Sequence, residues 1–192
     1  LENLGVNRVR DLLFLLPVSG IHRYKNTDLN TMSLPAVVTI DILVKSYRQT
    51  SKTSPIRVLV ISSKSELELV FFHARINWIK STLPKNERRA VSGKLESFAS
   101  GLQIVHPDYI LPLSEIDSIP EFEPIYPLSK GISQKFLIKT INQAIEKKVY
   151  FKEWINKSVL SQFKWPSFNF AISMAHNPKH IDEIQQKNLP RE

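Results

Sequence analysis

The sequence has 192 residues, of which 42% are hydrophobic and 23% are charged, values that are ordinary for a globular protein. No stretch approaches the roughly 20 apolar residues that a membrane helix needs, so we expect no membrane contact. The absence of cysteine excludes disulfides, thiol catalysis and thiolate metal sites, and it fits a cytoplasmic location. The first residue is Leu1 rather than Met, so we expect a piece of a longer chain.

The excess of positive charge gathers in the middle of the chain. Of the net charge of +8, residues 36–112 hold the larger part, with eleven cations against six acids. A locally basic domain attracts polyanions, because its cations neutralise phosphates and release counterions. A basic surface that is merely well solvated explains the same excess, so charge alone leaves both interpretations open.

The first 35 residues are predicted to form a helix and a connector. The helix is expected over residues 1–16 and ends at Pro17. Its core-facing stripe is formed by Val9, Leu12, Leu13 and Leu16. In the connector, Tyr24 is expected to pack, and Arg23 is expected to be either a surface charge or a phosphate contact.

Between residues 36 and 112 the pattern predicts five strands and one helix. Period-two alternation places the strands at residues 36–45, 56–61, 66–72, 88–98 and 102–110. Gly93, in the middle of the fourth strand, suggests a bulge or bend. A short helix over about residues 74–83 lies between the third and fourth strands. This order of elements is that of an OB-fold barrel.

Four prolines between residues 112 and 127 indicate a linker, and helical patterns follow it, the first of them capped by Ser133. The predicted fold is therefore α+β: a five-stranded OB-fold barrel preceded by a helix and followed by a Pro-rich linker and a small helical region. The predicted divisions are 1–35 (helix and connector), 36–112 (barrel), 113–131 (linker) and 132–192 (helical region).

The third strand passes directly into the short helix, and an aromatic residue stands at that point. Glu66, Glu68 and Phe72 share one face by period two, so the glutamates mark the face of Phe72 as exposed. Trp78 lies off the apolar stripe of the helix, which is formed by Ile76, Ile79 and Leu83. Exposed aromatics beside cations suit stacking on unpaired bases. A single exposed aromatic is also common where it merely covers a neighbouring strand, and this alternative stays open.

The predicted nucleic-acid contacts lie on this segment and on the barrel strands. OB barrels bind ligands on the face of strands two and three and through adjoining loops. The candidate residues are Phe72, His73, Arg75, Trp78, Arg57, Arg88, Arg89 and Lys94.

No catalytic or metal-binding constellation occurs in the sequence. A phosphate loop of the form G-x-x-x-x-G-K-[ST] is absent, since Ser92-Gly93-Lys94 lacks the upstream glycine. His176 and His180 are four residues apart, but Pro178 between them breaks a helix. We therefore expect this chain to bind rather than catalyse, with no cofactor of its own.

Five motifs in order along the chain carry a family resemblance. They are Leu4-Gly5-Val6 with Asp11-Leu12-Leu13, Leu16-Pro17 and Arg23-Tyr24; Phe71-Phe72; His106-Pro107-Asp108-Tyr109; Pro124-Ile125-Tyr126-Pro127; and Ala175-His176-Asn177-Pro178. Together they resemble the N-terminal wedge portion of RecG, a family of ATP-dependent helicases that remodel branched DNA.

The resemblance implies an OB-fold wedge that grips replication forks or Holliday junctions in DNA repair and recombination. It also implies ATP and Mg in a motor domain outside this sequence, a single-stranded-DNA-binding protein as a further candidate partner, and a monomer. In that family an aromatic at the end of strand three stacks on a base at the fork, which corresponds to Phe72. A second aromatic four residues later would be Ile76 here, which the helical pattern buries, so Trp78 is the substitute candidate. His73 stands where the family often has Asn.

Two other functions fit the same residues. One is a generic single-strand-binding OB module, and the other is a scaffold whose aromatic face meets a partner protein. A preference for junctions over plain single strands separates the wedge from the generic module. Binding that ignores salt favours the scaffold, because phosphate neutralisation always carries a salt dependence.

Overall fold

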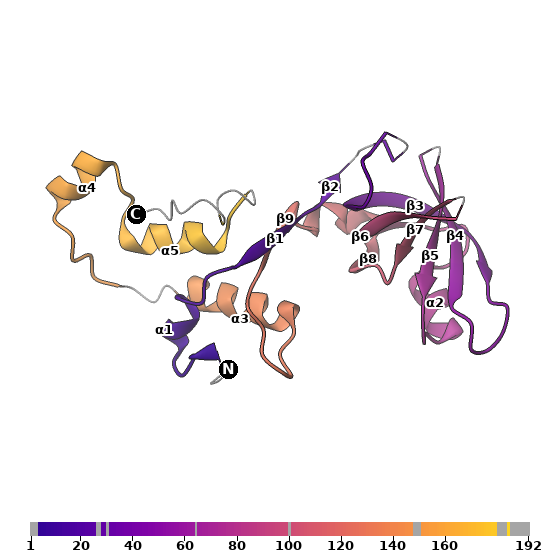
Figure 1. Cartoon of the computed structure of the whole chain (residues 1–192), viewed down its shortest axis with the longest axis horizontal. Coiled ribbons are helices and arrows are strands. Elements are labelled where there is room, and N and C mark those ends of the chain that lie inside the picture. Colours follow the sequence, from indigo (N-terminus) through magenta and orange to yellow (C-terminus); the bar gives the residue numbers. More distant parts are fainter. Residues whose placement is uncertain are drawn as a thin grey trace. The chain divides into compact units, whose positions relative to one another are not determined.

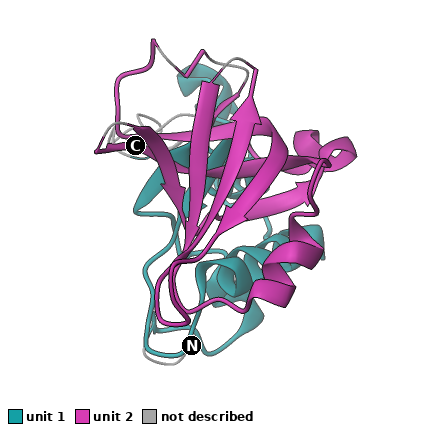
Figure 2. Cartoon of the chain, turned by 90° about the vertical axis from the view of Figure 1, so that its right-hand side faces the viewer, with its two compact units in different colours: residues 1–22, 122–192 teal, residues 23–121 magenta. Residues whose placement is uncertain are grey.

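The computed structural model describes residues 4–25, 28–29, 31–63, 65–99, 101–147, 151–179 and 184. The chain divides into two compact units, coloured separately in Figure 2: unit 1 holds residues 1–22 and 122–192, and unit 2 holds residues 23–121. These boundaries differ from the sequence-based divisions, because the first 22 residues join the C-terminal region rather than form a domain with the connector. No helix in the described part of the chain is long and apolar enough to cross a membrane.

Unit 2 is a closed five-stranded barrel of the predicted OB type (Figure 1). Its strands pair in the order β3-β4-β5-β7-β6, and β6 returns to β3 to close the ring. The β5–β7 pair is parallel and the other pairs are antiparallel. The strands are β3 (Ala36–Arg48), β4 (Ile56–Ser62), β5 (Ser65–Phe71), β6 (Arg88–Phe98) and β7 (Gly101–Val105), with α2 (Ile76–Thr82) between β5 and β6.

The barrel core follows the period-two pattern. Alternate residues of β3 are buried, and so are their counterparts on β4 and β5. Ile79 and Leu83 at α2 join the same apolar cluster, so α2 is attached to the barrel by its predicted stripe. Each such side chain contributes about 1.5–3 kcal/mol when fully buried.

Gly93 does not mark a bulge. The pairing of β3 with β6 runs without a shift from Ala36↔Leu95 to Leu43↔Arg88, and the register shift in β3 lies instead between Val44 and Ser46, opposite β4. Gly93 is required for close packing, because an added Cβ would lie 2.7 Å from Ile104 Cγ2 and 3.1 Å from the Pro107 Cα.

The predicted fifth strand over residues 102–110 is divided in two. β7 ends at Val105, and β8 (Tyr109–Pro112) pairs with β6 instead of continuing along β5. The break occurs at His106, whose φ of 46° lies in the left-handed region. Pro107 follows immediately and has no N–H to donate to a neighbouring strand. Ser100, just before β7, lies outside the described residues.

Segments that the sequence pattern identified as connector and linker contain strands and a 3-10 helix. β1 (Ser19–His22) pairs antiparallel with β9 (Phe122–Ile125), and β2 (Tyr24–Lys25) adds to β3 in parallel. The 3-10 helix η2 (Leu113–Ser118) precedes β9. The linker prediction therefore missed β9, because four residues that include Pro124 show no readable alternation.

Unit 1 is helical around a second apolar core. Besides β1 and β9 it contains α1 (Val9–Leu12), α3 (Gln134–Glu146), α4 (Lys157–Phe163) and α5 (Phe168–His176). The prediction of Ser133 as the cap of α3 is confirmed, since its hydroxyl accepts the Phe136 N–H at 3.3 Å. The core residues are Val6, Leu12, Leu13, Tyr126, Leu137, Ile141 and Ala144.

The helix predicted over residues 1–16 is only four residues long where the structure describes it. The Asp11 carboxylate accepts the backbone N–H groups of Asn7 and Arg8 at 3.0 and 2.7 Å, which fixes the start of α1. Val9, expected in the buried stripe, is exposed. Residues 1–3 lie outside the described part, as do residues 180–183 and 185–192.

His176 joins three segments inside unit 1. Its Nε2–H donates to the Leu13 carbonyl at 2.9 Å, and the Tyr126 hydroxyl donates to its Nδ1 at 3.0 Å. The Tyr126 and His176 rings are stacked at 5.8 Å. Burial lowers the pKa of His176, although the bond to Leu13 opposes the shift, and burial raises the pKa of Tyr126.

The buried His176 predicts that unit 1 loses stability on mild acidification. Because its folded-state pKa lies below the ordinary value of 6.5, the unfolded chain binds the proton more readily. This stability is fully present above about pH 6.5 and decreases as the pH falls below that value. Urea unfolding followed by helical circular dichroism, which reports mainly unit 1, measures it between about pH 5.5 and 7.5.

His176→Gln is the matched control, because glutamine keeps hydrogen-bonding groups and cannot titrate in this range. We expect its unfolding free energy to change less with pH than that of the parent. An identical pH dependence in both proteins would rule out His176 as the titrating group.

Candidate nucleic-acid interface

The candidate interface begins where β5 ends. Phe71 is the last residue of β5 that pairs with β4, opposite Ile56, and its side chain is buried. Phe72 follows it and is 46% exposed, as the alternation with Glu66 and Glu68 predicts. A large aromatic ring therefore stands at the rim of the barrel.

A second exposed ring comes from α2. Trp78 is 50% exposed and meets the buried Phe71 ring edge-on, with centroids 6.1 Å apart. Ile76 packs against the core, as predicted. The Tyr47 hydroxyl of β3 donates to the Leu83 carbonyl at 2.6 Å, which attaches the end of α2 to the barrel. The buried Phe71 thus supports the exposed Trp78 ring.

The turn between β5 and α2 brings four of the predicted residues together. His73 has a φ of 54°, a left-handed conformation that turns the chain out of β5. Arg75 precedes α2, and its carbonyl accepts the Ile79 N–H at 3.1 Å. His73 and Arg75 are both exposed, as Phe72 and Trp78 are.

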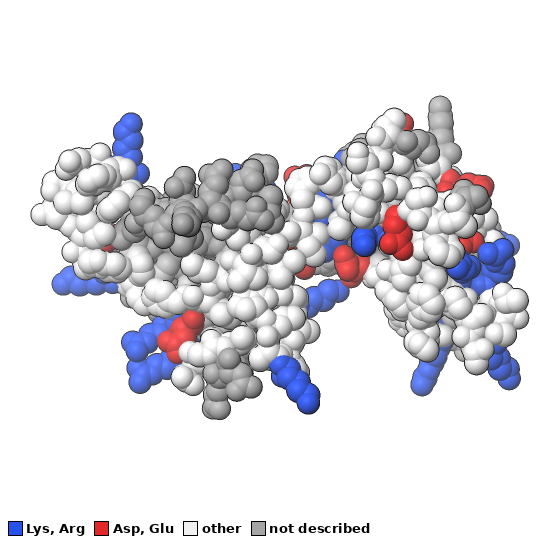
Figure 3. Space-filling model, in the orientation of Figure 1, with Lys and Arg blue, Asp and Glu red and all other residues white. Residues whose placement is uncertain are grey.

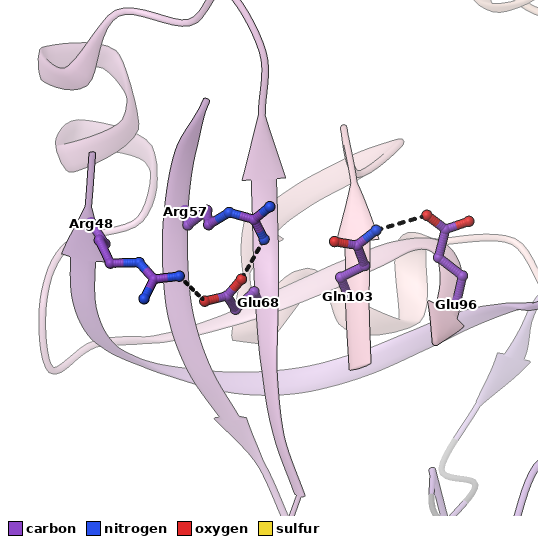
Figure 4. A network of polar contacts seen from close by, with 5 residues as sticks. All are labelled: Arg48, Arg57, Glu68, Glu96 and Gln103. Carbon is purple, nitrogen blue, oxygen red and sulfur yellow. Dashed lines mark hydrogen bonds and ion pairs between the residues drawn. The ribbon is translucent and has the colours of Figure 1, made fainter. Parts of the chain in front are cut away.

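Arg57 belongs to an ion-pair network on the outer face of the sheet (Figure 4). Glu68 accepts hydrogen bonds from Arg57 at 2.5 Å and from Arg48 at 3.4 Å. The Arg57 guanidinium also lies 6.0 Å from the centre of the Phe98 ring, which is 58% exposed. Because Glu68 pairs with both arginines, this face carries less positive charge than Arg48 and Arg57 alone would give it.

Three further predicted cations, Arg88, Arg89 and Lys94, are also held by acids. Arg88 donates through two nitrogens to the Asp41 carboxylate, with Nε 3.0 Å from Oδ1. This hydrogen bond and the negative charge of Asp41 raise the pKa of Arg88. Arg89 lies 2.8 Å from Glu87, and Lys94 lies 3.9 Å from Glu96.

Arg75 differs from these four cations. Among the described residues it has no acidic partner within ion-pair distance. On the face drawn in Figure 3, cations and acids of the barrel lie beside one another rather than in one basic patch. Phe72, His73, Arg75 and Trp78 are thus exposed on the single segment that leaves β5 and enters α2, whereas the other cations are distributed over the strands.

Arg23 is neither a surface charge nor an exposed phosphate contact, which corrects the expectation from sequence. Its side chain is buried, and one guanidinium nitrogen donates to Ser92 Oγ at 3.0 Å and to Asp108 Oδ2 at 2.8 Å. The guanidinium also lies 5.0 Å from the centre of the Tyr109 ring. Tyr24, expected to pack, is exposed. Arg23 is therefore the residue that attaches the connector to the barrel.

His106 is the residue beside Phe72 whose role sequence reasoning only partly identified. The alternation of His106 with Leu102 and Ile104 predicts that it is a hydrogen-bonded structural histidine, and it does accept a hydrogen bond, from the Phe72 N–H at 3.2 Å. Its proximity to Phe72 could not be seen in the sequence, because the two residues are 34 positions apart. No group of three His, Cys, Asp or Glu side chains in the described part of the chain could hold a metal ion.

Comparison with known proteins gives consistent matches along most of the chain. The model of the RecG wedge domain family matches residues 1–148. An ATP-dependent DNA helicase RecG of Aquifex aeolicus is 24% identical over 192 residues, covering 94% of this chain and 24% of the relative. The RecG helicase of Pasteurella multocida is 28% identical over 148 residues, covering 76% of this chain and 21% of the relative.

The solved structure of a RecG bound to a three-way DNA junction has the same fold. It superposes with a TM-score of 0.72 at 21% identity, covering 96% of this chain and 26% of that protein. The chain spans about a quarter of the length of the curated relatives that it matches.

Proposed function

The chain belongs to the RecG wedge domain family, and from that premise we propose that it is the part of an ATP-dependent DNA helicase that binds and splits branched DNA. The observation that carries the proposal is the exposure of Phe72, Arg75 and Trp78 on the short segment that leaves β5 at the rim of the barrel and enters α2. The three-way DNA junction bound by the related RecG supports the same substrate class.

The rim suits a branch point for physical reasons. An exposed aromatic ring can stack on an unpaired base, and such stacking contributes about 1–3 kcal/mol per base. A branch point offers unpaired bases beside duplex arms, whereas linear duplex keeps its bases stacked. Arg75 supplies a cation for a phosphate next to that base. We therefore propose Phe72 as the stacking residue and Trp78 as the second aromatic contact.

One observation favours a different surface. Arg57 lies against the exposed Phe98 ring on the outer sheet face, an arrangement that could hold a single strand in a generic OB module. Glu68 opposes that function, because it already pairs with Arg57 and Arg48. The rim is therefore the better candidate, and Phe98 provides the comparison that separates the two.

Phe72→Ala tests the proposed function against a matched control. We expect it to weaken binding to a synthetic three-strand fork by about 1–3 kcal/mol, the usual contribution of base stacking. Phe98→Ala removes a ring from the sheet face that is somewhat more exposed than Phe72, and it should change affinity by less than about 0.5 kcal/mol, as for ordinary surface substitutions. Fluorescence anisotropy with a labelled fork measures both.

Equal losses in the two variants would move the binding surface to the sheet face and favour the generic module. No loss in Phe72→Ala, with the barrel still folded, would remove the rim from the DNA contact. Affinities that ignore salt in the parent protein would favour the protein-docking scaffold.

Ion pairing predicts that the cations contribute unequally to the salt dependence. Arg75→Ala should reduce the slope of log affinity against log salt by about 0.7–0.9, the value for one lost phosphate contact. Arg88→Ala should reduce it less, because Arg88 is already neutralised by Asp41. Titrations of the fork at several salt concentrations measure the slopes, and a larger change for Arg88→Ala would contradict the rim assignment.

We also propose that this chain alone hydrolyses no ATP, and that ATP and Mg act in a motor domain of the longer protein. The sequence lacks the glycine-rich loop and lysine that cradle phosphates. Purified chain should show no turnover above a mock preparation, with or without fork DNA. Turnover above that background would contradict the proposal.

We also propose a cellular location, an oligomeric state and a partner for the chain. A cytoplasmic location agrees with the absence of cysteine. A monomeric state and a single-stranded-DNA-binding protein as partner complete the proposal. Sedimentation and binding measurements with that partner test both.

A further inference from the structure

We propose that His106 is a positioning residue that fixes the main chain and ring of Phe72 in the orientation needed for stacking. The inference rests on the proposed function of Phe72. It assigns to the His106-Pro107-Asp108 turn a task in binding that does not require the turn to touch DNA.

β5 ends at Phe71, one residue before Phe72. The β4 ladder stops at the pair Ile56↔Phe71, so the N–H of Phe72 lies beyond it. His106 supplies two hydrogen bonds there: its own N–H donates to the Val70 carbonyl at 2.9 Å, and its Nε2 accepts the Phe72 N–H at 3.2 Å. One residue thus holds the strand on both sides of Phe71.

The His106 ring also packs against both phenylalanine rings. The His106 ring leans against Phe72, with centroids 5.7 Å apart and an interplanar angle of 35°. It also meets the buried Phe71 edge-on at 6.2 Å. His106 therefore supports one side of the Phe72 ring, and the surface that stays exposed is the surface that a base would meet.

The His106-Pro107-Asp108 turn is itself held in place by the barrel. His106 adopts a φ of 46°, which non-glycine residues keep only when the surroundings impose it. Pro107 packs against Gly93, and its Cα lies 3.1 Å from the position that a Cβ on Gly93 would occupy. Asp108 accepts a hydrogen bond from the buried Arg23 at 2.8 Å. Contacts with the barrel interior therefore fix the position of His106, and His106 in turn fixes Phe72.

The consequence for binding is preorganisation. A ring whose main chain is already fixed loses less conformational entropy when a base stacks on it. Without the acceptor that His106 provides for the Phe72 N–H, Phe72 would follow the end of β5 with only its ring contacts to restrain it. Replacement of His106 should therefore weaken DNA binding only when the Phe72 ring is present.

A double-mutant cycle on the synthetic three-strand fork tests this dependence. We expect His106→Ala to weaken binding about threefold to tenfold, in the range for directly interacting side chains. In the Phe72→Ala background the same change should have little further effect. Additive losses would overturn the proposal, because they would show that His106 contacts DNA itself. Unchanged affinity in His106→Ala, when Phe72→Ala is weakened, would overturn it as well.

Two conservative variants separate the hydrogen bond from the ring. His106→Gln places an acceptor near the position of Nε2 and should restore most of the affinity, whereas His106→Phe keeps a ring without an acceptor and should not. Rescue by Phe alone would contradict the positioning role of the hydrogen bond.

A measurement without DNA keeps this inference distinct from the proposed function. The Phe72 amide should exchange its hydrogen slowly in the parent and in His106→Gln, and faster in His106→Ala and His106→Phe. Amides of β3 report whether each variant remains folded. Equal Phe72 exchange in all four proteins would overturn the inference. If Phe72→Ala binds forks like the parent, the proposed function fails, and amide exchange still decides the role of His106.

Discussion

Closure of the barrel through β3 is the constraint on which the rest of unit 2 depends. The first part of this thirteen-residue strand pairs with β6 and the last part with β4, so one strand fixes both neighbours. That closure places Ser92 of β6 inside the barrel wall, where Thr39 and the buried Arg23 bond to it. Phe72 stands at the rim because β5 has no further partner in β4 after Phe71.

Charge and structure together point to a surface of limited basicity. The barrel region has an excess of cations, but Glu68, Asp41 and Glu87 each engage an arginine. A phosphate must compete with an acid that is already in place, so these pairs add less to polyanion binding than the same cations would alone. Selectivity for a branched shape can then come from aromatic contacts at the rim, which need an unpaired base.

The sequence predicted the elements whose signal is local and missed those whose signal is distant. Period two revealed the barrel strands and the exposure of Phe72, and helical spacing revealed that Trp78 is exposed while Ile79 is buried. β1 and β9 were missed because two four-residue strands about a hundred positions apart show no period of their own. Arg23 was placed outside because arginine is seldom buried, and its partners lie 69 and 85 positions away.

The most direct measurement of the central claim is a competition among DNA shapes for this chain. Fork, four-way junction, single strand and linear duplex of equal length compete against a labelled fork at about 0.15 M salt. The account predicts that the fork and the four-way junction compete about tenfold better than linear duplex or single strand, a difference of about 1.4 kcal/mol. Equal competition by all four DNAs would contradict a rim built to meet a branch point.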